Sequence, residues 1–275
     1  MSGGAGVAPV RVRHAVFLPP FGELADPRRC AALAASAEEH GWDGFFLWDH
    51  VLRPDPPMAV ADPWVTLAAV AVATERIRLG PMITPIVRRR PQKLAREVTT
   101  LDQLSGGRLI LGLGLGVDTG RELSGFGELV DPLERGDLLD EGIELLRAMW
   151  SGERVEHHGE HFVADGVVLL PRPTQLPYPP IWMAARTTAA RPLRRAARQA
   201  GLFVIEVDAE SLSGMLELIR SERGTLDGYD VAAVRHGGID ASAYETAGVT
   251  WWMTDVAPGV PAADVSAMVA AGPPS

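Results

Sequence analysis

The segment RIRLGPMITPIVRRRPQKLAREVTTLDQLSGGRLILGLGLG, residues 76–116, contains a strand, a helix and a second strand in close succession. An apolar run over residues 77–84 predicts the first strand. The helix after it begins at Pro91 and ends at the glycine pair of residues 106–107. Its apolar positions recur at helical spacing: Leu94, Val98, Leu101 and Leu104. Residues 108–115 return to a strand pattern, so the segment predicts two parallel strands joined by a helix.

The same unit recurs on both sides of this segment. Two upstream helices each begin with an Asp–Pro pair, Asp26-Pro27 and Asp62-Pro63, in which the aspartate caps the helix and the proline takes its first position. A further helix is expected over residues 132–150. Strands are expected at residues 15–18, 44–48, 77–84, 108–115, 181–184, 202–207, 231–234 and 249–254. Eight parallel strands close without an exposed edge, which predicts an α/β fold of the (β/α)8 TIM-barrel type rather than an open doubly wound sheet.

One stretch interrupts this alternation. Residues 151–179 contain short alternating runs and several prolines, and we expect a hairpin insertion there, before the fifth strand. Residues 1–13 are expected to form a flexible N-terminal tail. Because such barrels commonly need about 200 to 250 residues, residues 14–275 are expected to form a single domain.

The composition excludes several classes of partner and chemistry. A net charge of −9 without a basic cluster excludes nucleic acid as the expected partner. Cys30 is the only cysteine, so it cannot form an intrachain disulfide, and Lys93, the only lysine, is a poor candidate for a Schiff-base aldolase. No apolar run has the length of a signal peptide or membrane span, so we expect a cytoplasmic protein without a membrane partner.

In barrels of this type the catalytic groups follow the carboxyl ends of the strands. Four clusters occupy those positions: Asp49-His50, Thr84-Pro85, Gly114 to Gly116, and Ala184 to Thr187. An imidazole moves a proton near neutral pH, and a neighbouring carboxylate tunes it, so His50 and Asp49 are the candidate catalytic residues. The alternative is that this dipeptide only ends a strand or caps a helix.

Several segments resemble the luciferase-like oxidoreductases, which use a flavin or a deazaflavin. They are HGWDGFFLWDHVL (residues 40–52), residues 76–116 quoted above, ERGDLLDEGIELLRAMWSGERVEHHGEHF (residues 134–162) and AGVTWWMTDV (residues 247–256). The resemblance implies an isoalloxazine-type ring in the barrel mouth with the substrate stacked against it, for hydride transfer or oxygenation.

The same resemblance assigns residues to the ring. It implies that Asp49 lies near the polar edge of the ring and that His50 acts as the acid or base. The backbone of residues 81–84, which includes Met82 and Thr84, is expected beneath the ring, and a cis non-proline peptide at Pro81-Met82 or Met82-Ile83 would be diagnostic. Gly114 and Gly116 leave room for the ring or its ribityl chain, unless they serve only tight barrel packing.

The phosphate end of the site departs from the family pattern. Relatives often carry a glycine pair after the fifth strand, where this chain has Ala184-Ala185 followed by Arg186 and Thr187. These four residues are the candidate phosphate ligands through backbone amides and charge-assisted contacts; the alternative is simple helix capping and solvated charge. Val117 occupies the region where deazaflavin-dependent sugar dehydrogenases place a carboxylate acid, which disfavours sugar-phosphate oxidation. Asp118, Arg121 and Glu122, in the loop that follows, are the nearby alternatives.

Two other charged clusters receive structural interpretations. The segment around HHGEHF, residues 157–162, is expected to be a hairpin with its turn at Gly159, so neighbouring side chains alternate faces and no metal site is expected. Four arginines at helical spacing are expected to form a solvated helix face: Arg191, Arg194, Arg195 and Arg198.

These observations favour an oxidoreductase that transfers a hydride between coenzyme F420 and a small organic substrate. The preference for F420 rests on a composition rich in alanine, arginine and glycine, which suggests a lineage where deazaflavins are frequent. An FMN-dependent monooxygenase or reductase is the alternative. Other readings are a catalytically silent flavin- or F420-binding barrel and a metal-dependent hydrolase. A homodimer is implied by the resemblance alone.

Overall fold

The computed structural model describes residues 11–235 and 239–274, in which parallel strands alternate with helices along the chain. The main sheet has the strand order β3-β2-β1-β11-β10-β9-β8-β5-β4, and every neighbouring pair is parallel. Its strands are β1 (Arg13–Leu18), β2 (Gly44–Leu47), β3 (Arg78–Pro81), β4 (Thr84–Pro85), β5 (Leu111–Gly114), β8 (Ile181–Ala185), β9 (Gly201–Val204), β10 (Asp230–Arg235) and β11 (Trp251–Asp255).

The sheet closes on itself at β3. A parallel bridge joins Leu79 to Leu109, with the Ile110 N–H donating to the Leu79 carbonyl at 2.9 Å. Strands β3 and β4 are two halves of one barrel strand, separated by Met82 and Ile83, whose peptide bond is cis as expected for one of the two positions. Counted in this way the sheet has eight barrel strands, so the predicted (β/α)8 barrel is confirmed.

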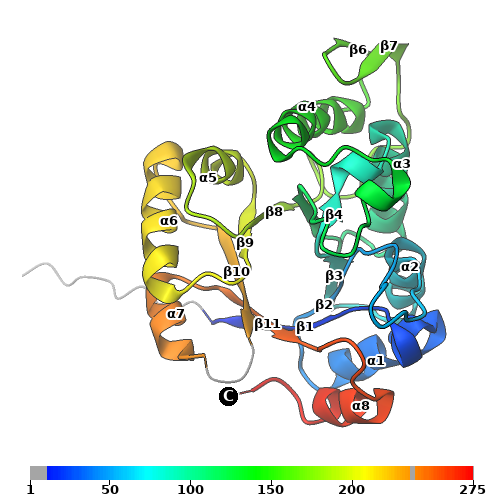
Figure 1. Cartoon of the computed structure of the whole chain (residues 1–275), viewed down its shortest axis with the longest axis vertical. Helices are drawn as coiled ribbons and strands as arrows, with labels where there is room; N and C mark the ends of the chain where they lie inside the picture. Colours follow the sequence, from blue (N-terminus) through cyan, green and yellow to red (C-terminus); the bar gives the residue numbers. More distant parts are fainter. Residues whose placement is uncertain (1–10, 236–238, 275) are drawn as a thin grey trace, which may run out of the picture.

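Helices surround the strands (Figure 1). They are α1 (Pro27–Glu39), α2 (Pro63–Ala73), α3 (Pro91–Leu104), α4 (Pro132–Trp150), α5 (Ala190–Ala197), α6 (Ala209–Arg223), α7 (Ala241–Ala247) and α8 (Ala262–Ala270), with short 3-10 turns at Gly22–Ala25, Ile86–Arg88 and Ser124–Phe126. The two predicted caps are confirmed, because the Asp26 carboxylate accepts the Arg28 N–H at 2.9 Å and the Asp62 carboxylate accepts the Val65 N–H at 2.8 Å. In the described residues, no helix combines the length and the apolar character needed to cross a bilayer.

The predicted hairpin lies between α4 and β8. It consists of β6 (Val155–His158) and β7 (Val163–Val167), paired antiparallel, and Figure 1 shows it projecting past α4 at one end of the molecule. The Gly159 N–H donates to the Phe162 carbonyl at 3.0 Å across the turn, as predicted. Glu141 of α4 anchors the hairpin, since its carboxylate accepts His157 Nε2 at 2.9 Å and the Phe162 N–H at 2.8 Å.

Several expected boundaries differ from the structure, most clearly the expected strand over residues 202–207, which ends at Val204. Residues 1–10 of the expected tail lie outside the described residues, and Arg13 already belongs to β1. The fourth barrel strand begins at Leu111 rather than at Arg108. Arg108 is buried, and its guanidinium donates to the carbonyls of Ala71 (2.7 Å) and Thr74 (2.9 Å) at the end of α2, so this residue satisfies a helix terminus instead of extending the strand.

The barrel interior below its carboxyl end is filled by large side chains. Phe46, Trp182, Phe203 and Trp251 are fully buried, and the indole rings of Trp182 and Trp251 lie 5.4 Å apart between centroids. This aromatic layer makes the lower barrel a packed core, as is usual for the fold. The open end above it is therefore where a ligand can enter.

A substitution at Gly80 tests the contact that closes the barrel between β3 and the backbone of Ile110, just before β5. A β-carbon added there would lie 1.8 Å from the Ile110 carbonyl oxygen, and backbone cannot move as a side chain end can. We expect Gly80→Ala to lower the free energy of unfolding by about 2 kcal/mol or more, measured by urea unfolding. Gly214→Ala in α6 is the matched control, because that position has open space around it and alanine should stabilise the helix by about 0.5–1 kcal/mol. Equal effects of the two substitutions would contradict this account of closure.

Candidate active site at the barrel mouth

A cavity of about 410 Å³ lies at the carboxyl end of the barrel. Its wall includes a residue from each predicted cluster, namely His50, Pro85, Gly114 and Ala185 among others, so the four clusters converge as expected. Asp49, Met82, Gly116, Ala184, Arg186 and Thr187 also line the cavity. Thr84 does not, because it is fully buried and its hydroxyl donates to the Asp49 carboxylate at 2.7 Å.

Asp49 is the most heavily bonded carboxylate at the mouth, and its side chain has no exposed surface. Its oxygens accept hydrogen bonds from Trp64 Nε1 at 3.1 Å, from Thr84 Oγ1, and from the guanidinium groups of Arg88 and Arg89, each at 3.1 Å. A buried carboxylate needs such partners, because an unpaired charge in the interior is costly. The Asp49 carboxylate therefore ties the ends of β2 and β4 to the start of α2 and α3.

The carboxylate partner of His50 is Glu122, which corrects the expected pairing with Asp49. His50 Nδ1 lies 2.9 Å from Glu122 Oε2, and Glu122 Oε1 accepts the backbone N–H groups of Val51 at 3.0 Å and Leu52 at 3.1 Å. In the tautomer that this contact requires, Nδ1 donates its proton to Glu122. No hydrogen bond from Nε2 to a described residue is present, and this nitrogen is left for a ligand in the cavity.

The environment of Glu122 favours its ionised form. Burial of the side chain raises its pKa, but the hydrogen bond from His50, the backbone N–H of Leu52 and the positive charge of Arg88 outweigh burial and hold the pKa below its ordinary value. Arg88 reaches both carboxylates, with one amino group 3.2 Å from Glu122 and the other 3.1 Å from Asp49. Arg88 thereby links the buried Asp49 anchor to the His50–Glu122 pair.

The glycines of β5 serve close packing against the neighbouring strand. A β-carbon on Gly112 would lie 2.5 Å from the Pro81 carbonyl oxygen, and one on Gly114 would lie 2.2 Å from Ile83 Cδ1. Gly116 has a φ of +73° and approaches the Pro85 ring. These contacts favour the tight-packing interpretation of the glycines, and Met82, Ile83 and Gly114 also line the cavity.

The residues after β8 present polar groups to the cavity. Arg186 forms an ion pair with Glu206, yet 45% of its side chain is exposed, so the guanidinium can turn toward a ligand. The Thr187 hydroxyl accepts the Ala189 N–H at 3.2 Å. Helix α5 begins directly afterwards, and no side chain caps it. The first amide N–H groups of the helix therefore do not donate to a side-chain cap.

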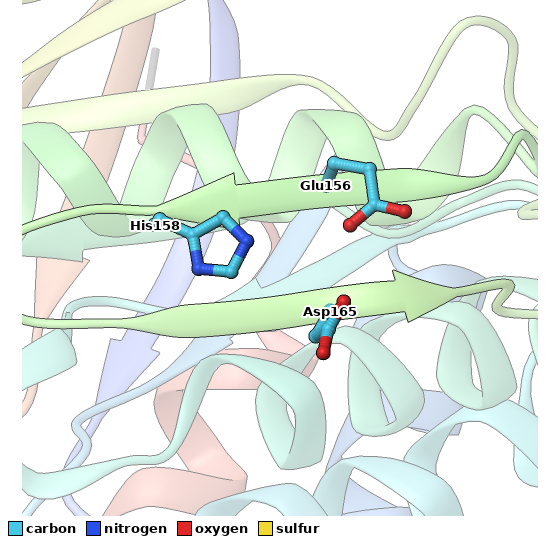
Figure 2. A group of neighbouring side chains, drawn as sticks. All are labelled: Glu156, His158 and Asp165. Carbon is cyan, nitrogen blue, oxygen red and sulfur yellow. The ribbon is translucent and has the colours of Figure 1, made fainter.

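The hairpin carries a second group of potential ligand atoms. Figure 2 shows Glu156 and His158 on β6 beside Asp165 on β7, with one nitrogen or oxygen from each lying within 4.8 Å of the others. All three are exposed, and Glu156 already accepts Arg154 Nε at 3.1 Å and the Gly166 N–H at 2.9 Å. A cation would have to displace the arginine from Glu156, so we do not assign a metal site to these three residues.

Sequence reasoning did not assign Glu122 or Arg88 to the site. Glu122 lies in the long loop between β5 and α4, whose path a pattern does not encode, and it entered only as one of several nearby acids. Arg88 belongs to the RRR run before α3, which was a family motif without a stated contact. The signal for both was their location after a barrel strand.

The Glu122→Gln variant tests whether Glu122 is ionised in the folded protein and stabilises it. Because the folded pKa lies below the ordinary value of 4.5, ionised Glu122 stabilises the fold above that pH, and its contribution is lost as the pH falls through the folded pKa. We expect the variant to be less stable by about 1–3 kcal/mol at pH 7, with the difference shrinking below pH 4.5. Glu217→Gln, at an exposed position of α6, is the control. A pH-independent difference in urea unfolding would contradict the ionised state.

Comparisons with known proteins show which family and fold the chain shares. The family model described as luciferase-like monooxygenase matches residues 7–244. A protein of Nakamurella multipartita named F420-dependent glucose-6-phosphate dehydrogenase is 35% identical over 200 residues, covering 71% of this chain and 56% of that protein. The chain thus matches little more than half the length of this relative.

Solved structures share the fold. An F420-dependent secondary alcohol dehydrogenase in complex with an F420–acetone adduct has a TM-score of 0.78 at 16% identity, covering 94% of this chain and 97% of that one. A monooxygenase from Streptomyces bottropensis has a TM-score of 0.75 at 20% identity, covering 94% of this chain and 96% of that one. With the family match spanning most of its length, the chain belongs to the luciferase-like monooxygenase family.

Proposed function

We propose that this chain is an oxidoreductase that binds coenzyme F420 in the barrel mouth and transfers a hydride between this cofactor and a small organic molecule. One observation carries the proposal: a histidine held by a buried carboxylate and the arginine of the turn after β8 line the same cavity. The relative that is 35% identical and named F420-dependent supports the choice of cofactor. When bound, the cofactor supplies the hydride chemistry, and the protein supplies orientation and proton transfer.

The cavity suits a flat heterocycle. Its volume of about 410 Å³ falls within the range of small-molecule sites. Met82, Ile83 and Gly114 offer an apolar surface on one side, which would hold the ring by stacking and exclude water from the reacting face. Asp49 and Thr84 act from behind this wall as positioning residues, since neither has a free polar group for the cofactor.

The turn after β8 suits the cofactor phosphate. Ala184 and Ala185 belong to β8 and pair with β9, so the phosphate ligands of this proposal are the groups that follow them. The Thr187 hydroxyl can donate a hydrogen bond, and Arg186 adds positive charge after leaving Glu206. These two side chains take the place of the glycine pair in this proposal.

His50 moves the proton. Glu122 fixes the ring with Nδ1 protonated, so Nε2 can accept the proton of a substrate hydroxyl during oxidation or return it to a carbonyl oxygen during reduction. The ionised Glu122 also stabilises the imidazolium formed after the proton has moved. Glu122 is thus a positioning residue for His50.

Other features of the proposal stay predictions from the sequence. The homodimer and the cytoplasmic location are among them, and so is the direction of hydride transfer. An FMN-dependent monooxygenase is the second candidate, because a monooxygenase shares this fold at a TM-score of 0.75.

Cofactor titration separates the candidates. Purified protein is titrated with F420 and, separately, with FMN, while cofactor fluorescence is followed. We expect saturable quenching by F420 at micromolar concentrations and at least tenfold weaker binding of FMN. Tight FMN binding without F420 binding would replace the proposal with its flavin alternative, and binding without turnover of any alcohol, enone or quinone would favour the silent barrel.

His50→Asn tests the proton-transfer role. The loss of general acid–base catalysis should lower kcat about 10²- to 10⁴-fold, while the dissociation constant of F420 changes less than threefold, because the ring wall is untouched. His158→Asn on the exposed hairpin is the matched control and should leave both quantities unchanged. Steady-state kinetics and fluorescence titration give the two values. A fall in F420 affinity equal to the fall in kcat would assign His50 to cofactor binding instead.

A further inference from the structure

Among the residues that the structure describes, two arginines line the cavity, and they are held with unequal strength. The Arg195 side chain is 8% exposed, and its guanidinium donates to the Asp140 carboxylate through two nitrogens and to the Gly136 carbonyl at 3.1 Å. Arg186 forms its ion pair with Glu206 and has no other hydrogen bond or ion pair from its side chain to a described residue. Arg186 is therefore the arginine that a ligand in the cavity can recruit.

Glu206 meets Arg186 because their strands are neighbours. Strands β8 and β9 are parallel, with Ala185 opposite Val204, and the Ile205 N–H donates to the Ala185 carbonyl at 3.1 Å. The chain segments after these strands leave the barrel side by side at its carboxyl end, and Arg186 and Glu206 both line the cavity. The acid thus lies beside the arginine that the proposed function assigns to the cofactor phosphate.

The backbone of Glu206 adopts an unfavourable conformation. Its φ is +57°, in the left-handed region that a residue with a β-carbon adopts at a cost, and Arg121 is the other non-glycine residue with a positive φ in residues 11–235 and 239–274. Such a conformation persists where its surroundings hold it. The Glu206 carboxylate has Arg186 as its hydrogen-bond and ion-pair partner within those ranges. A single exposed ion pair thus holds this side chain.

A phosphate group competes well for this arginine. An ion pair between two exposed side chains gains little free energy, because water solvates both charges and both long side chains must be ordered. A phosphate offers several oxygens to one guanidinium, and the hydroxyl of Thr187, the next residue, can donate to it as well. The phosphate can therefore displace Glu206, but its net affinity is lowered by the free energy of the ion pair that it breaks.

Resting on the proposed function, we infer that Glu206 is an internal competitor for the cofactor phosphate and sets the affinity of the cavity for the cofactor. In the empty protein Glu206 holds Arg186, and in the complex the phosphate takes the guanidinium and releases Glu206 to solvent. Arg195, held by Asp140, keeps its contacts in both states. The opposite role, in which Glu206 holds Arg186 in the position that binds phosphate, predicts effects of opposite sign.

Removal of the competing charge tests this inference. Glu206→Gln is titrated with F420 and, separately, with the phosphate-free deazariboflavin that carries the same ring, while the ring fluorescence is followed. We expect F420 to bind about two- to fivefold more tightly than to the wild type, with the affinity for deazariboflavin unchanged. Glu206→Asn, a neutral residue that tolerates a positive φ, should act in the same direction.

Glu222→Gln is the matched control. It removes the same charge from another exposed ion pair, the one between Glu222 of α6 and Arg194 of α5, and neither of these residues lines the cavity. It should leave both affinities unchanged. In a second comparison, Arg186→Gln should weaken F420 binding about tenfold, and adding Glu206→Gln to it should give no further gain, because the competition needs the guanidinium.

The outcomes separate this inference from the proposed function. An unchanged or lower affinity of both Glu206 variants for F420 would overturn the inference and leave F420 dependence intact. An equal gain for the phosphate-free ring would also overturn it, since the acid would then act on the cavity in general. If the wild type binds FMN and not F420, FMN and riboflavin test the same competition. Failure of both cofactors to bind the wild type would remove the proposed function and the inference with it.

Discussion

The buried Asp49 carboxylate is the constraint on which the mouth of this barrel depends. Its oxygens bind Trp64 at the start of α2, Thr84 on β4, and Arg88 and Arg89 before α3. Because its side chain has no exposed surface, the charge is stable only while these donors remain in place. The carboxylate therefore fixes four segments relative to one another at the end of the barrel that holds the cavity.

Arg88 connects the buried Asp49 carboxylate to the residues at the cavity. The same guanidinium that binds Asp49 also binds Glu122, and Glu122 in turn holds His50 and the backbone after β2. Burial separates the two residues: the Asp49 side chain has no exposed surface, while 31% of the His50 side chain is exposed at the cavity. In the proposed function, proton transfer and structural support therefore belong to different members of one network.

The architecture could be predicted because its signals are local and periodic. Apolar runs located the barrel strands, and Asp26 and Asp62 marked their helices through cap chemistry alone. The site was harder, since neighbouring residues can differ in exposure: Asp49 and His50 both border the cavity, but the Asp49 side chain has no exposed surface, whereas 31% of the His50 side chain is exposed. Glu122 reaches His50 from 72 residues away through an irregular loop, and no periodic pattern predicts such a contact.

A crystal structure of the protein with F420 tests the central claim most directly. The account predicts the deazaflavin ring in the mouth against Met82 and Ile83, with the phosphate near Arg186 and Thr187 and with His50 still bound to Glu122. A ring bound elsewhere, or a His50 turned away from both Glu122 and the cavity, would contradict it.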